Sequence, residues 1–165
     1  MLTIVVMLSI LFGTYLVLSG LDRWSTGMNL DAGIRGRISL ALVFIFTSTG
    51  HFMQTQAMVQ MLPAAVPMRE VIMYASGVLE LCLAAGLLVR RFAHMTGICV
   101  IVFLIVVLPA NIYAAIHRVD MGGHNLGPMY LLVRVPLQLI LAGWTYWFAI
   151  RRTRMPLGGI GHAAL

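Results

Sequence analysis

The chain has 165 residues, of which 61% are hydrophobic and only 10% are charged, and its formal net charge is +6. Soluble domains carry about 25% charged residues, so this composition excludes a water-soluble globular protein and predicts an integral membrane protein. All eleven basic residues are arginines that stand singly or at the ends of apolar runs, a pattern typical of topology signals and not of a nucleic-acid-binding patch.

Five apolar stretches are long enough to cross a membrane as helices, which takes about 20 residues. They are residues 2–20, 37–58, 70–89, 94–116 and 129–150. The first lacks the basic start and small-residue cleavage site of a signal peptide, so we expect it to remain as a membrane helix. The predicted fold is an all-α membrane protein with a four-helix transmembrane bundle over 37–150. An extra N-terminal transmembrane helix and its loop occupy 1–36, and a basic tail, expected to be disordered, occupies 151–165.

The placement of the arginines predicts the orientation of these helices, because positive residues gather on the cytoplasmic side. Eight arginines lie in three segments that would share one side: the first loop with the start of the second helix, the turn after the third helix, and the tail. Only Arg69 and Arg118 lie on the other side. The bias predicts a multi-pass protein of the inner (plasma) membrane, with its N-terminus outside and its C-terminus in the cytoplasm.

Polar residues interrupt the second and third predicted helices. In the second, a polar stripe at helical spacing consists of Thr47, Ser48, His51, Gln54 and Thr55. In the third, Glu80 shares a face with Ser76 and Gly77, whose small side chains let a neighbouring helix approach closely. Because polar groups are costly in hydrocarbon, we expect both faces to point into the bundle.

The fourth and fifth helices carry polar residues near their outer ends. Pro109 leaves the carbonyl of Ile105 without its helical donor and predicts a kink where Asn111 turns inward. Arg134 and Gln138 line up on one face of the fifth helix. A rise of 1.5 Å per residue places the polar groups of all four helices in the outer half of the membrane, with His51 about 10–12 Å from the outer end of its helix.

These polar groups predict a pocket that opens outward and binds a small ligand. Its expected members are His51, Gln54, Glu80, Asn111, Arg134 and Gln138. Glu80 and Arg134 are expected to pair, since an unpaired charge at this depth costs about 2.5–3.5 kcal/mol. In the alternative interpretation, the ion pair is purely structural and Asn111 only joins helices.

The sequence argues against several other kinds of site. It contains no phosphate-binding loop, no nucleophile elbow, no HExxH and no dinucleotide fingerprint. Haem is disfavoured because His51 and His117 differ in depth by about 10 Å or more. No metal is predicted, since His51 and Glu80 have no evident third ligand. Cys82 and Cys99 lie in apolar runs and are interpreted as small buried residues.

Five ordered motifs resemble the DoxX-like family of small integral membrane proteins. They are STGHFMQ, MLPAAVP, SGVLELCLAAGLLVRR, LPANIYAAIH and RVPLQLILAGWTYW. The resemblance covers residues 37–150, implies a four-helix membrane bundle and supplies no catalytic residue set; the N-terminal helix lies outside it. Some relatives are associated with thiosulfate:quinone oxidoreductase or with membrane-bound redox assemblies.

Two functional hypotheses follow. In the first, the protein is a subunit of a quinone- or thiol-linked redox assembly in the lipid membrane, with a quinone as candidate cofactor and a redox protein as partner. His51 with Arg134 or Gln138 would donate hydrogen bonds to the head group. In the second, it is a non-enzymatic partner or assembly factor whose polar cluster holds the bundle together. A transporter is less favoured because no inverted repeat is visible. The sequence leaves open whether the protein is an enzyme.

Overall fold

The computed structural model describes residues 2–24, 30–119 and 124–154. Within these ranges every regular element is a helix: α1 (Leu2–Trp24), α2 (Ala32–Met53), α3 (Thr55–Val59), α4 (Arg69–Leu88), α5 (Ala93–Ile116), η1 (His124–Tyr130), α6 (Leu131–Thr145), η2 (Tyr146–Arg151) and α7 (Arg152–Arg154). Five helical segments are long and apolar enough to span a membrane, namely α1, α2, α4, α5 and Leu126–Arg151. The protein is therefore an all-helical, multi-pass membrane protein.

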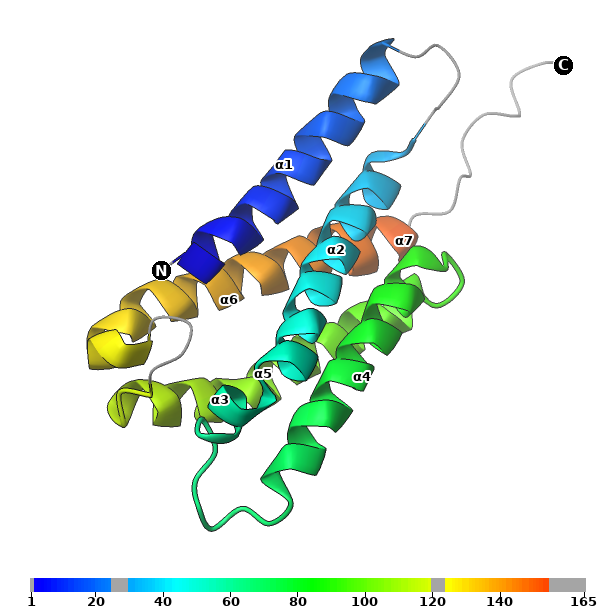
Figure 1. Cartoon of the computed structure of the whole chain (residues 1–165). Coiled ribbons are helices and arrows are strands. Elements are labelled where there is room, and N and C mark those ends of the chain that lie inside the picture. Colours follow the sequence, from blue (N-terminus) through cyan, green and yellow to red (C-terminus); the bar gives the residue numbers. More distant parts are fainter. Residues whose placement is uncertain (1, 25–29, 120–123, 155–165) are drawn as a thin grey trace, which may run out of the picture.

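The long helices form an antiparallel bundle in which each runs opposite to the one before it (Figure 1). The core contains buried side chains from all five: Leu11, Leu40, Leu87, Val100 and Leu137. Lipid tails are as apolar as leucine, so van der Waals packing and interhelical hydrogen bonds stabilise such a bundle more than the hydrophobic effect does. α1 buries only Ile4, Met7 and Leu11, as expected for a helix added to the outside of a four-helix bundle.

α2 differs at both ends from the predicted helix over 37–58. It begins at Ala32 because the Asp31 carboxylate accepts a hydrogen bond from the Gly33 N–H at 3.1 Å and caps the first turn. It ends at Met53 because Gln54 leaves the helical conformation, with φ −125° and ψ 32°, and the chain continues as the short α3. A single helix over 37–58 is therefore a wrong prediction, and His51 lies only about 3 Å along the axis from the end of α2.

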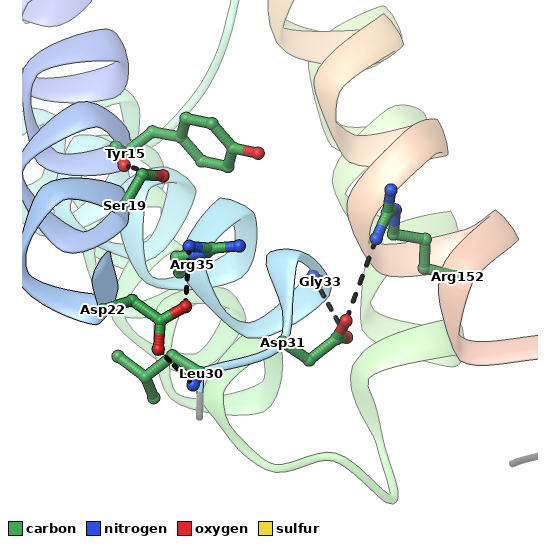
Figure 2. Close-up of polar contacts among 8 residues, drawn as sticks. All are labelled: Tyr15, Ser19, Asp22, Leu30, Asp31, Gly33, Arg35 and Arg152. Carbon is green, nitrogen blue, oxygen red and sulfur yellow. Dashed lines mark hydrogen bonds and ion pairs between the residues drawn. The ribbon is translucent and has the colours of Figure 1, made fainter. Parts of the chain in front are cut away.

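Ion pairs join the chain segments at the end of the bundle where the arginine-rich segments meet. Figure 2 shows Asp22 of α1 beside Arg35 of α2, and Asp31 beside Arg152 of α7. The N–O distances are 3.1 Å and 3.8 Å, respectively. The end of α1, the start of α2 and the end of the fifth span therefore lie on the same side of the bundle, as the arginine count predicts.

The first turns of α2 also contact α4, α6 and η2. The buried Arg37 donates a hydrogen bond to the carbonyl of Leu87 at the end of α4, at 3.5 Å. The indole N–H of Trp144 donates to the Gly36 carbonyl at 2.9 Å. A Cβ at Gly36 would overlap the Phe148 ring, so the absence of a side chain there is what lets the fifth span pack directly on α2.

Gly36→Ala should therefore destabilise the protein by about 1–3 kcal/mol, the usual cost of overpacking. Gly13→Ala in α1 is the matched control, since an added Cβ meets no described atom within 4 Å and alanine favours the helix. Denaturant titration in detergent micelles would compare their free energies of unfolding. Equal stability of the two variants would contradict the close packing of η2 on α2.

Candidate functional site

A cavity of about 110 Å³ lies between α2, α4, α5 and α6. Its polar lining consists of His51, Ser76, Glu80, Asn111 and Arg134. Its apolar lining consists of Met58, Met61, Met73, Phe103, Val107 and Ala110. The structure thus brings together polar side chains from four helices that are far apart in the sequence. Met58 and Met61 come from the segment around α3, so the cavity lies toward the end of the bundle opposite the arginine-rich end.

Among the ionisable side chains that line this cavity, His51 and Glu80 lie closest to each other. Their Nε2 and Oε1 atoms are 3.8 Å apart, and both side chains are largely buried. Two features of α4 bring α2 this close. The buried Ser48 hydroxyl donates to the Gly77 carbonyl at 2.8 Å, and a Cβ at Gly77 would stand only 2.8 Å from the Cβ of His51. The absence of a side chain at Gly77 therefore allows His51 to approach Glu80.

The predicted direct ion pair between Glu80 and Arg134 is not formed. Among the described residues, Glu80 is at ion-pair distance from His51 alone. The physical reason is the close approach of α2 to α4, which gives the position beside Glu80 to His51. Arg134 lines the main cavity and also two adjoining cavities of about 50 Å³ and about 20 Å³. The cluster is therefore an open arrangement around a cavity and not a closed ion pair.

Asn111 points into the bundle, with 3% of its surface exposed. Its amide nitrogen donates to the Val107 carbonyl at 2.9 Å. Its amide oxygen has no hydrogen-bond partner in the described part of the chain, and the residue lines the cavity. α5 continues through Pro109 to Ile116, so the proline does not end the helix before Asn111. The asparagine is thereby held in place by its own helix while its oxygen stays available.

The two glutamines of the predicted site lie elsewhere. Gln138 donates its amide N–H to the Leu104 carbonyl and so joins α6 to α5. It lines the cavity of about 20 Å³ beside Arg134 and not the main one. Gln54 is exposed and lines none of the three cavities. The prediction for Gln54 assumed a continuous helix, and the break at this residue turns its side chain away.

The structure adds residues that sequence reasoning did not assign to the site. Ser76 lines the main cavity, although the sequence indicated only that it permits close packing. Thr47 and Met7 line the adjoining cavity of about 50 Å³. Met7 belongs to α1, the extra N-terminal helix, for which no site residue was predicted from the sequence. The spacing of the apolar residues along α1 alone gives no sign that one of them reaches a polar cavity.

Four buried polar atoms around these cavities have no hydrogen-bond partner among the described residues: His51 Nδ1, Glu80 Oε2, Asn111 Oδ1 and Gln138 Oε1. An unsatisfied buried polar atom costs about 1–3 kcal/mol. Native proteins rarely leave several such atoms together, and water or a ligand usually completes them. The first three of these atoms belong to residues that line the main cavity, so this cavity is the candidate ligand site.

The fold and the cavity define a helical multi-pass membrane protein with a polar site between four of its helices. The chain belongs to the family described as "Domain of unknown function (DUF8561)", which matches residues 40–149. The match runs from α2 to η2 and leaves out α1. No curated protein and no solved structure matches the chain. The resemblance to the DoxX-like family stays a prediction.

The contact between His51 and Glu80 predicts energetic coupling between them. A double-mutant cycle with His51→Ala and Glu80→Ala should give an interaction free energy of about 0.5–3 kcal/mol, as for other residues in contact. A second cycle with Glu80→Ala and Arg134→Ala is the control and should give a smaller value, because these side chains are not paired. Free energies of unfolding in micelles would be measured. A larger coupling in the Glu80–Arg134 cycle would refute the observed pairing.

Proposed function

We propose that the protein binds the polar head group of a membrane-dissolved molecule in the cavity between α2, α4, α5 and α6, and that this molecule is a quinone. The observation that carries the proposal is a set of buried atoms on one cavity for which the described residues offer no well-formed hydrogen bond, His51 Nδ1, Glu80 Oε2 and Asn111 Oδ1. Their burial is costly unless something bonds to them. Two of these atoms are acceptor oxygens, so the reduced form of a quinone, whose hydroxyls donate on opposite sides of the ring, would satisfy them, and the imidazole nitrogen can bond to either form.

The size of the cavity supports a ligand with a single ring. The main cavity has about 110 Å³ and the adjoining one about 50 Å³. An engineered protein cavity of about 150 Å³ binds benzene, so this space suits one six-membered ring and is too small for a nucleotide or a sugar chain. The side chains of Met58, Met61 and Met73 are unbranched and polarisable, which suits contact with the faces of a ring.

The polar lining suits both oxidation states of a quinone. The two carbonyl oxygens of the oxidised form need donors, which the His51 imidazole and the Arg134 guanidinium can supply. In the reduced form these oxygens are hydroxyls that donate, and Asn111 Oδ1 and Glu80 Oε2 can accept. Reduction of a quinone to a quinol takes two electrons and two protons. In this proposal a separate redox protein supplies the electrons, and His51 and Glu80 pass the protons.

The redox role extends the resemblance to DoxX-like proteins, with the protein as a subunit of a quinone- or thiol-linked assembly. The alternative is an assembly factor or other non-enzymatic partner in which water fills the cavity and the polar residues only join helices. The cavity beside these residues favours the first hypothesis, because a closed cluster of paired side chains would leave no room for a head group.

Quinone binding by the purified protein in lipid nanodiscs tests this proposal. His51→Ala should weaken binding by roughly 2- to 12-fold, the effect of losing one hydrogen bond worth about 0.5–1.5 kcal/mol. His117→Ala is the matched control, because His117 is exposed, stacks on Tyr113 and does not line the cavity. If the wild-type protein binds no quinone, or if both variants bind as it does, the assembly-factor hypothesis becomes the better one.

We also propose that the protein resides in the inner (plasma) membrane with its N-terminus outside and its C-terminus in the cytoplasm. Eight of the eleven arginines support this orientation, which puts the cavity in the outer half of the membrane. A fluorescent protein fused to the C-terminus should fluoresce, and alkaline phosphatase fused there should be inactive, since each folds on one side only. An active phosphatase fusion would show that the C-terminus lies outside and would contradict the proposed topology.

A further inference from the structure

α1 packs over the seam between α2 and α6. Its buried residues Ile4, Met7 and Leu11 recur every three to four positions and form one stripe along the helix. Phe12 of α1 also meets the ring of Trp144 in α6, with the ring centroids 5.2 Å apart. Figure 1 shows α1 alongside α2. The helix therefore contacts the bundle along the line where the second and fifth spans adjoin.

Met7 is the residue of α1 that reaches the site. It lines the cavity of about 50 Å³ together with Val43 and Thr47 of α2 and with Arg134 and Leu141 of α6. Its own surface is only 4% exposed. Because its neighbours on this cavity come from the helices on both sides of the seam, the Met7 side chain closes the cavity at the position where α1 covers it.

The cavity behind Met7 lies next to the main cavity. Four side chains line both cavities and stand between them, namely Glu80, Phe103, Val107 and Arg134. Met7 does not line the main cavity itself and lies beyond these four side chains. The polar edge of the site, with His51 and Asn111, belongs to the main cavity alone. A ligand that reaches the adjoining cavity would therefore contact mainly apolar side chains there.

We infer that Met7 determines the size of the head group that the site accepts, an inference that rests on the proposed function. With methionine in place, the space suits a one-ring quinone. Shortening this side chain would join the adjoining cavity to the space that the thioether vacates, and a fused second ring would then fit against Val43 and Phe103. The match to the family begins at residue 40, so Met7 belongs to a helix outside the matched segment.

Two matched quinones make the inference testable. Tetramethyl-1,4-benzoquinone has one ring, and 2,3-dimethyl-1,4-naphthoquinone carries a fused benzo ring in place of two of the methyl groups. Both are fully substituted on the quinone ring, so neither adds readily to the free thiols of Cys82 and Cys99. These two residues are exposed on the helix surfaces, and the prediction from the sequence that they are buried is wrong. Equilibrium dissociation constants for both compounds would be measured with the full chain in nanodiscs.

The wild-type protein should bind the one-ring compound more tightly. Met7→Ala should shift the ratio of the two dissociation constants toward the two-ring compound by about ten-fold or more, which is the discrimination that small changes of size produce in apolar pockets. Met7→Leu, which nearly conserves volume, should keep the wild-type preference. Val5→Ala is the control on the same helix, because Val5 is 58% exposed and lines neither cavity.

The outcomes separate this inference from the proposed function. If the wild-type protein binds neither quinone, the proposed function fails. If it binds them but Met7→Ala leaves the ratio unchanged, Met7 does not determine the size of the head group, and the proposed function stands. A shift with Val5→Ala as large as that with Met7→Ala would also overturn the inference. Should Met7→Ala fail to fold, Met7→Val provides a smaller truncation that must shift the ratio in the same direction.

Discussion

The close approach of α2 and α4 at Gly77 is the constraint on which the site depends. In a membrane, helices associate through close packing and interhelical hydrogen bonds, and small residues make both accessible. Gly77 provides both the close packing and the hydrogen bond. It has no side chain to separate the helices, and its carbonyl accepts a hydrogen bond from the Ser48 hydroxyl. His51 follows Ser48 by one turn and Glu80 follows Gly77 by one turn, and their Nε2 and Oε1 atoms are 3.8 Å apart. The proximity of the ionisable side chains of His51 and Glu80 therefore results from the close packing of the α2 and α4 backbones.

This constraint also explains the position of Arg134. His51 is the residue at ion-pair distance from Glu80, while Arg134 borders the main and adjoining cavities and is hydrogen-bonded to the buried Tyr130 side chain. A buried cation in a membrane protein is expected to face other polar groups, water or a ligand. The close packing of α2 on α4 thus leaves the polar residues arranged around the main cavity.

The sequence predicted the spans and the inward-facing residues better than the contacts between them. Glu80 and Asn111 are buried because a polar group in hydrocarbon is costly, and this rule needs only the sequence. The partner of Glu80 depends on the distance between two helices, which no periodicity encodes. The end of α2 depends on one backbone conformation at Gln54, within a run that remains apolar enough to continue. The role of Met7 depends on how α1 packs across two other helices.

The two ends of the bundle differ in how fully their polar groups are satisfied. At the arginine-rich end, Asp22 and Asp31 pair with Arg35 and Arg152, and Arg37 bonds to carbonyls of α2 and α4. One buried atom there, Arg35 Nε, has no partner among the described residues. In the half that holds the cavities, four buried polar atoms have no partner among the described residues. At about 1–3 kcal/mol each, their combined cost would approach the whole stability of a typical protein, about 5–15 kcal/mol. Water or a ligand that bonds to these atoms would remove this cost, and a ligand that bonds to several of them would take the place of several separately ordered waters.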